Sequence, residues 1–134
     1  YNHMDDSFFE NIFALKRIAV VGLSPKANRP SNYVSKYMLE NGYDIIPVNP
    51  GHNTIFGIPC YSSLKKIPFS IDIVNVFRNS KFALETVIEA IDIGTKVIWL
   101  QDGVESKQAQ EIAKDNNICF VMDDCILRRH RAIK

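Results

Sequence analysis

The residues best placed to do chemistry lie in one short segment with the sequence IAVVGLSPKANRPS. Its apolar part ends at Gly22, and a polar loop with Lys26 and Arg29 follows. Pro30 suits the first turn of a helix, where its missing N–H is no loss, and Ser31 is a good capping residue. The free N–H groups at a helix start bind anions, and phosphate is a common guest. The segment therefore predicts a phosphate cradle made of a strand, a turn and a helix.

The glycine pattern of this turn departs from the dinucleotide-binding fingerprint, which has glycine at three positions. Here Gly22 is followed by Ser24 and Ala27 at the other two. Gly22 could therefore serve only the tight turn that any strand–helix unit needs. The guanidinium of Arg29, whose fork of donors suits phosphate, favours the phosphate-binding interpretation.

The composition is that of one globular domain. Hydrophobic residues make up 46% of the 134 residues, and the formal net charge is +1. This balance gives no reason to expect nucleic-acid or membrane binding, and no apolar run is long enough to span a bilayer. Three cysteines without ligand spacing, and no secretory signal, predict reduced thiols, no bound metal and a cytoplasmic protein. Residues 1–134 are expected to be a single domain, with residues 1–6 disordered or vector-derived.

Apolar runs alternate with amphipathic stretches along the chain. This alternation predicts an α/β fold, a Rossmann-like doubly wound sheet of five parallel strands with helices on both faces. The strands are expected at residues 17–23, 44–48, 71–77, 96–100 and 118–122. The helices are expected at residues 8–15, 31–41, 80–93 and 106–116, with a short basic helix from about residue 124. The segment between the second and third strands, residues 49–70, is expected to form a lobe over the ligand cleft.

In such a sheet, ligands bind at the carboxyl ends of the strands. The second strand ends at Val48, Asn49 and Pro50, where NAD-binding domains carry a carboxylate for the ribose hydroxyls. No acid stands there, and Lys26 and Arg29 add positive charge nearby. The pattern favours an adenosine with an additional phosphate, as in coenzyme A or NADP.

The third strand brings Val76, Phe77 and Arg78 to the same edge of the sheet. A cation directly after a buried strand usually has a partner. That partner could be a ligand or an acid such as Asp102 or Asp123, and the sequence leaves both open.

A catalytic set of residues is not evident. His52 lies in a loop, where a lone histidine is more often solvated than a catalytic base. No Ser-His-Asp arrangement, metal-spaced ligand set or Walker-type motif can be read. The basic run at residues 128–131 fits a solvated helix end, because cations favour helix C-termini, or a surface for a protein partner. We expect a small-molecule binding module rather than an enzyme, and no particular protein partner is predicted.

Five ordered segments resemble the stand-alone CoA-binding domain family, which is similar to the N-terminal domain of the succinyl-CoA synthetase alpha subunit. They are residues 19–31, 42–50, 72–78, 99–103 and 121–125. The resemblance implies a Rossmann-like domain that holds coenzyme A or an acyl-CoA, with the pyrophosphate at the glycine turn and the helix start. The residues that the resemblance and the cradle together assign to the ligand are Gly22, Leu23, Ser24, Lys26, Arg29, Pro30, Ser31, Val48, Asn49, Pro50, Val76, Phe77 and Arg78.

Two points qualify this resemblance. Asp102 and Asp124 stand where the family often has a neutral and a basic residue, so they bring negative charge near an anionic ligand. The phosphorylated histidine and nucleotide-grasp parts of the larger synthetases have no counterpart in these 134 residues. The alternative interpretation is an NADP-binding, oxidoreductase-like protein using the same cleft, although a dehydrogenase usually adds a second nucleotide-binding half or a substrate domain.

Overall fold

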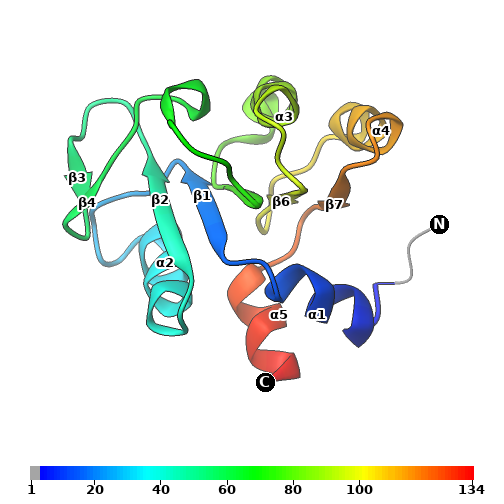
Figure 1. Cartoon of the computed structure of the whole chain (residues 1–134), viewed down its shortest axis with the longest axis horizontal. Coiled ribbons are helices and arrows are strands. Elements are labelled where there is room, and N and C mark those ends of the chain that lie inside the picture. Colours follow the sequence, from blue (N-terminus) through cyan, green and yellow to red (C-terminus); the bar gives the residue numbers. More distant parts are fainter. Residues whose placement is uncertain (1–3) are drawn as a thin grey trace.

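A computed structural model describes residues 4–134 of the chain. Five parallel strands form one sheet in the order β2-β1-β5-β6-β7 (Figure 1). From β1, the chain first adds β2 on one side and then β5, β6 and β7 on the other. This arrangement confirms the predicted Rossmann-like, doubly wound fold. The strands are β1 (Arg17–Val21), β2 (Asp44–Val48), β5 (Ile73–Val76), β6 (Val97–Leu100) and β7 (Cys119–Val121).

Helices cover both faces of the sheet, as the alternation of elements predicts (Figure 1). The predicted and observed helices agree apart from their ends. One face carries α1 (Asp6–Phe13), α2 (Pro30–Glu40) and α5 (Ile126–Ile133), and the other carries α3 (Ala83–Asp92) and α4 (Lys107–Asp115). A 3₁₀ turn, η2 (Ser80–Phe82), leads into α3.

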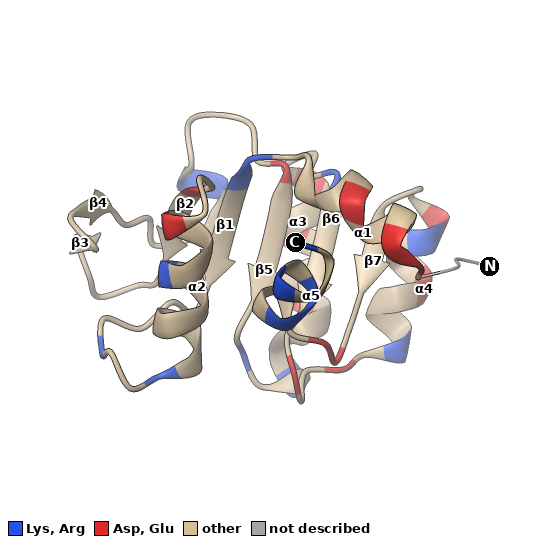
Figure 2. Ribbon diagram, turned by 90° about the horizontal axis from the view of Figure 1, so that it is seen from below, with Lys and Arg blue, Asp and Glu red and all other residues tan. Residues whose placement is uncertain are grey.

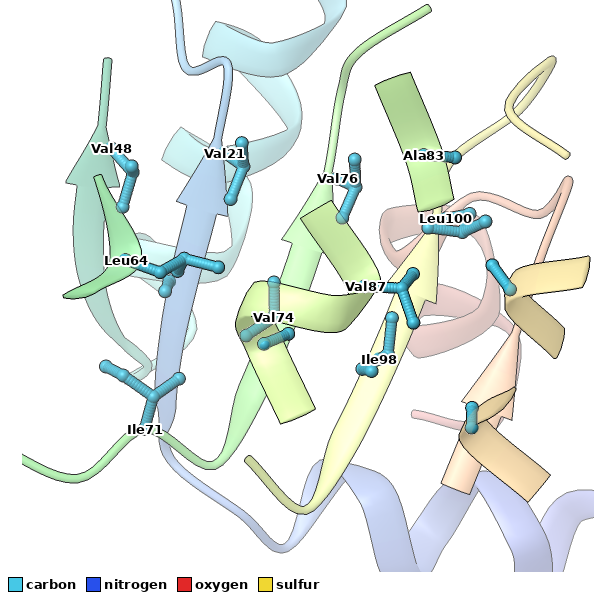
Figure 3. Close-up of a cluster of buried hydrophobic side chains, with 14 of the residues drawn as sticks. Val21, Val48, Leu64, Ile71, Val74, Val76, Ala83, Val87, Ile98 and Leu100 are labelled. Carbon is cyan, nitrogen blue, oxygen red and sulfur yellow. The ribbon is translucent and has the colours of Figure 1, made fainter. Parts of the chain in front are cut away.

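The face under α3 and α4 is almost wholly aliphatic (Figure 3). Val21, Val74 and Ile98 of three neighbouring strands pack with Val87 of α3 and with Leu64 from the long segment after β2. The strands are apolar on both sides because helices cover both faces, which is why their sequences read as continuous runs rather than alternating ones.

The opposite face is richer in aromatic residues. Phe9 and Phe13 of α1 lie 5.7 and 6.0 Å from the ring of Trp99 on β6. Trp99 Nε1 donates to the carbonyl oxygen of Asp124 at 2.8 Å, which joins β6 to the residues that lead into α5. The indole is thereby both buried and hydrogen-bonded, as a core tryptophan requires.

His130 attaches α5 to this aromatic face. Its side chain is buried, and its ring lies edge-on to the rings of Phe13, Tyr37 and Tyr43. Tyr37 Oη and His130 Nδ1 are hydrogen-bonded at 2.8 Å. The histidine therefore links α5 to both α1 and α2, and α5 is a packed part of the domain rather than a solvated helix end.

The N-terminal helix begins earlier than the sequence predicts. Asp5 Oδ1 accepts a hydrogen bond from Phe8 N at 3.0 Å and caps α1, which starts at Asp6. Asp5 and Asp6 are therefore ordered parts of the helix start, and residues 1–3 lie outside the described part of the chain.

The segment between β2 and β5 contains structure that the sequence does not signal. It holds an antiparallel hairpin of two short strands, β3 (Thr54–Ile55) and β4 (Ile58–Pro59), and a 3₁₀ turn, η1 (Leu64–Lys66). Strands of two residues are too short to produce a periodic pattern. Figure 1 shows the hairpin beyond β2, at the outer edge of the sheet.

Candidate functional site

A cleft of about 780 Å³ opens at the carboxyl ends of β1, β5 and β6, between α2 and α5. It lies where the strand order reverses, between β1 and β5, which is where sheets of this topology bind ligands. Its volume is within the range of small-molecule sites. The lining residues are Gly22, Ser24, Arg29, Pro30, Ser31, Tyr33, Val34, Phe77, Gln101, Asp102, Val104, Cys125, Leu127, Arg128, Arg131 and Ala132.

Gly22 turns the chain from β1 into the cleft. Its φ is +87°, and a Cβ built there would overlap the carbonyl oxygen of Phe77. Gly22 N donates to Val48 O at 2.9 Å, and Phe77 N donates to Val21 O at 2.9 Å, so the turn is clamped between both neighbouring strands. The fold itself therefore requires glycine at this position, whatever ligand the cleft holds.

The loop before α2 is held in place by side chains of the helix. Ser31 Oγ accepts from Ser24 N at 2.9 Å, and Asn32 Nδ2 donates to Ser24 O at 2.8 Å. Ser24 Oγ in turn accepts from Lys26 N at 3.1 Å. Ser31 and Asn32 are buried, and their part-buried bonds to the backbone of Ser24 hold the loop against the start of α2.

Two unengaged donors meet at the start of α2. Arg29 is the exposed N-cap residue of the helix, and within residues 4–134 its guanidinium makes no hydrogen bond or ion pair. Pro30 has no N–H, and Ser31 N makes no hydrogen bond within the same residues. A free helix N–H beside a free guanidinium provides both the donors and the charge that an anion needs.

The wall opposite α2 carries a network of four charges. Arg128 Nη1 and Nη2 donate to the two carboxylate oxygens of Asp102 at 3.0 and 2.9 Å. Arg128 Nη2 also lies 3.1 Å from Asp124 Oδ1, and Arg129 Nε donates to Asp124 Oδ2 at 2.8 Å. The hydrogen bonds from Arg128 hold the pKa of Asp102 below its usual range. Each acid that departs from the family's usual pattern is thus paired with an arginine of α5.

Figure 2 shows this arrangement at the level of the whole face: basic residues of α5 lie in the middle, and acidic residues follow the strand ends beside it. The arginines of the basic run at residues 128–131 therefore have two different roles. Arg128 and Arg129 neutralise acids, and Arg131 lines the cleft with its guanidinium 5.6 Å from the ring of Tyr37 on α2.

The floor of the cleft is a buried pair of amides. Gln101 follows β6, and its side chain is hydrogen-bonded to the side chain of Asn75 on β5 at 2.7 Å. In the other amide orientation, with its oxygen turned toward α5, Gln101 instead accepts from Ile126 N and Trp99 Nε1, each at 3.2 Å. This orientation satisfies the first N–H of α5 and fixes the helix start at the cleft.

The predicted ligand residues fall into four groups in the structure, of which Asn49 and Arg78 form the last. Leu23, Val48 and Val76 are buried in the core beside the cleft, and Lys26 and Pro50 are exposed outside its lining. The residues that the structure brings together in the lining are Gly22, Ser24, Arg29, Pro30, Ser31 and Phe77.

Asn49 and Arg78 are not in the lining of the cleft, and both make contacts within the domain. Asn49 Nδ2 donates to Leu23 O at 2.8 Å and ties the end of β2 to the loop after β1. Arg78 Nη1 donates to Thr86 Oγ1 at 3.1 Å and lies 3.8 Å from Glu85 Oε2, so its guanidinium faces α3. The partner of Arg78 is therefore on α3, and not the Asp102 or Asp123 considered from the sequence.

Sequence reasoning missed the α5 wall of the cleft. Leu127, Arg128, Arg131 and Ala132 line it, together with Cys125 at the helix N-cap. The sequence pattern that could have indicated this wall is the spacing of Ile126 and His130, which predicts a short helix with one buried face.

Among residues 4–134, no group of three or more His, Cys, Asp or Glu side chains could hold a metal ion. No helix in the same range has the length and apolar character needed to cross a membrane.

The structure is that of a Rossmann-like α/β domain, a doubly wound parallel sheet with a cleft at its reversal point. The family whose model matches residues 16–131 is described as a CoA binding domain. The match spans most of the chain, and the chain belongs to this family.

Three relatives place the chain more closely. The uncharacterized protein YneT of Bacillus subtilis (strain 168) is 43% identical over 119 residues, which are 89% of this chain and 88% of that protein. The solved structure of a hypothetical protein from Pyrococcus horikoshii OT3 superposes with a TM-score of 0.93 at 37% identity, over 97% of this chain and 92% of that one. Acetate–CoA ligase [ADP-forming] I of Archaeoglobus fulgidus is 26% identical over 127 residues, which are 87% of this chain but only 18% of the ligase.

Proposed function

We propose that this domain binds coenzyme A or an acyl-CoA in the cleft between α2 and α5, with the phosphates at the start of α2. The observation that carries the proposal is the pair of unengaged donors there, the Arg29 guanidinium and Ser31 N–H, at the reversal point of the sheet. A phosphate at this position would receive charge-assisted hydrogen bonds from both. Membership in a family of CoA-binding domains supports the same ligand.

The shape of the cleft supports one direction for the bound molecule. It extends from β1 past β5 to β6, whereas β2 lies on the other side of β1. Because neighbouring strands are about 4.8 Å apart, the end of β6 is about 10 Å from the end of β1. In our proposal the adenosine lies toward β2 and the pantetheine arm runs past Phe77 toward Gln101.

Apolar side chains and one buried amide are available to that arm. Val34, Phe77, Val104 and Leu127 line the cleft between its two ends, and Gln101 lies at its floor. A chain of methylenes interrupted by amides, which is the chemistry of pantetheine, matches a mostly apolar lining with an occasional polar group.

Isothermal titration with coenzyme A, 3′-dephospho-coenzyme A, NADP and NAD tests the proposal. We expect coenzyme A to bind most tightly, and removal of its 3′-phosphate to weaken binding. The alternative of an NADP-binding, oxidoreductase-like protein gains no support from the relatives described above, and it predicts that NADP binds more tightly than coenzyme A. That result, or equal binding of NAD, would contradict the proposal.

We further propose that the domain by itself binds its ligand without chemical turnover. Among the described residues, the lining holds one carboxylate, Asp102, which is ion-paired, and one thiol, Cys125. Incubation with acetyl-CoA, with and without ATP and magnesium, followed by chromatography of the products tests this. Thioester hydrolysis or acyl transfer that is lost in Cys125→Ser would show that the domain is an enzyme.

A further inference from the structure

The end of the cleft farthest from α2 differs in charge from the rest of it. Three cations line the cleft within the described residues: Arg29, Arg128 and Arg131. Arg29 belongs to the start of α2, and Arg131 lies over Tyr37 of the same helix. Only Arg128 is close to the ends of β6 and β7, where the thiol end of a bound coenzyme A would lie if the proposed function is right.

Arg128 is fully engaged by this protein's own acids. It binds both oxygens of Asp102 and one oxygen of Asp124. The remaining oxygen of Asp124 is taken by Arg129. The two carboxylates and two guanidinium groups balance, so this end of the cleft has no spare positive charge.

Asp102 is the member of the network that a ligand would meet. Its side chain is 56% exposed and lines the cleft, whereas the side chain of Asp124 is 9% exposed and does not. Because Arg128 lowers the pKa of Asp102, this carboxylate stays ionised at neutral pH. A second carboxylate brought beside it would have to compete for Arg128 and would be repelled by Asp102.

We infer that the cleft selects coenzyme A thioesters whose acyl group is uncharged over those whose acyl group ends in a carboxylate, and that Asp102 is the residue that sets this preference. The inference rests on the proposed function, since it assumes that the phosphates bind at α2 and the acyl group near β6. An uncharged acyl chain would instead meet the apolar side chains of Val104 and Leu127, which line the same part of the cleft.

Butyryl-CoA and succinyl-CoA provide a matched pair of probes, because their acyl chains have the same number of carbons and differ by a terminal carboxylate. We expect the wild-type protein to bind butyryl-CoA about tenfold more tightly than succinyl-CoA in titration calorimetry. Asp102→Asn should bring the two affinities to within about threefold, mainly by strengthening the binding of succinyl-CoA. Arg128 stays anchored in this variant by Asp124.

Asp123→Asn is the matched control. Asp123 is exposed in the neighbouring loop and does not line the cleft, and an asparagine oxygen can still accept the hydrogen bond from Gly103 N. This variant should keep the wild-type preference, and circular dichroism should show all three proteins folded.

The outcomes separate the inference from the proposed function. If coenzyme A and butyryl-CoA bind and succinyl-CoA binds equally well, the proposed function stands and the inference is wrong. A preference that persists in Asp102→Asn, or that is lost equally in Asp123→Asn, also contradicts it. If none of the three ligands binds, the proposed function fails and the inference fails with it.

Discussion

The two walls of the cleft are ordered by different kinds of interaction. On the α2 wall, uncharged groups hold the loop: Ser31 and Asn32 bond to the backbone of Ser24, and the one arginine, Arg29, is left free. On the α5 wall, ion pairs hold the helix start, and Arg128 is consumed by Asp102.

The difference teaches where an anion can bind. The neutral hydrogen bonds of the α2 wall keep Arg29 available for a ligand, whereas the ion pairs of the α5 wall neutralise Arg128 and leave Arg131 outside the network. Arginine count alone would favour the α5 wall, which has Arg128 and Arg131 in the lining against Arg29 on the α2 wall, and only the partners of each arginine show which are available to phosphate.

The largest expected effect comes from the Gly22 turn, which leads from β1 into the loop of the α2 wall. Gly22→Val should lower the free energy of unfolding by about 3 kcal/mol or more, since the left-handed φ and the overlap with the Phe77 carbonyl oxygen add together. Urea denaturation measures the loss. The control is Gly94→Ala, which also has a positive φ but nothing within 4 Å of an added Cβ, and which should lose only about 1 kcal/mol. Equal losses of unfolding free energy in both variants would show that the Phe77 carbonyl moves aside to accommodate the new side chain.

Arg29→Ala tests whether the free cation of the α2 wall is the one that a phosphate uses. A charge-assisted contact contributes about 1.5–3 kcal/mol, so coenzyme A should bind roughly ten- to a hundredfold more weakly. The melting temperature should not change, because Arg29 is exposed and unpaired within the described residues. Lys36→Ala removes an exposed cation from the same helix outside the cleft lining and should leave binding intact. Comparable losses of affinity in the two variants would mean that Arg29 contributes only long-range positive charge and no direct contact with the phosphate.

Ser31→Ala breaks the neutral scaffold of the α2 wall while leaving its charge in place. The part-buried N–H of Ser24 loses its acceptor, which should lower the free energy of unfolding by about 1–2 kcal/mol and weaken coenzyme A binding. Ser31→Thr retains the hydroxyl and serves as the comparison. Full affinity in Ser31→Ala would mean that the loop keeps its conformation without this bond.

The smallest effect concerns the attachment of α5 and its dependence on pH. Burial, with the charges of Lys134 and Lys16, lowers the pKa of His130 below the usual value of 6.5 for a histidine. The unfolded chain therefore takes up this proton first, so stability is complete above about pH 6.5 and falls as the pH drops toward the folded-state pKa. The melting temperature of wild type should decrease in this window, and that of His130→Gln should decrease less. The same substitution at the exposed His52 should leave the wild-type profile; if it flattens the curve instead, His130 is not the responsible group.

The sheet and its helices were predictable because each element carries a periodic apolar pattern over more residues than the few by which its ends are uncertain. The strand at residues 44–48 and the helix that ends near Gly42 are examples in which the apolar pattern and the glycine agree. The hairpin of β3 and β4 left no such signal, and its turn places Phe56 at a φ of +59°, where sequence rules expect glycine or asparagine.

The α2 wall was predictable because its residues are close in sequence: Gly22, Ser24, Arg29 and Ser31 lie within ten residues of one another. The α5 wall was not predictable, because Arg128 and Asp102 are 26 residues apart in sequence and neither segment carries a pattern that indicates their pairing. The ends of β2 and β5 share this limit. Asn49 and Arg78 occupy plausible ligand positions in the sequence, but their side chains are committed to neighbours that only the folded chain brings close.

The position of β1 in the sheet has a consequence for how the chain folds. β1 pairs with β2, which is near in sequence, and with β5, whose first residue is Ile73, and the Arg17 N to Asp72 Oδ2 bond of 3.1 Å joins the starts of the same two segments. A nascent chain that stops before β5 leaves one edge of β1 open, and closing that edge requires a loop of more than fifty residues. Parallel pairing of this kind raises the contact order and slows folding. Pulse-labelled hydrogen exchange should therefore find the amides of β1 and β5 gaining protection together, in the step that commits the chain to its native state.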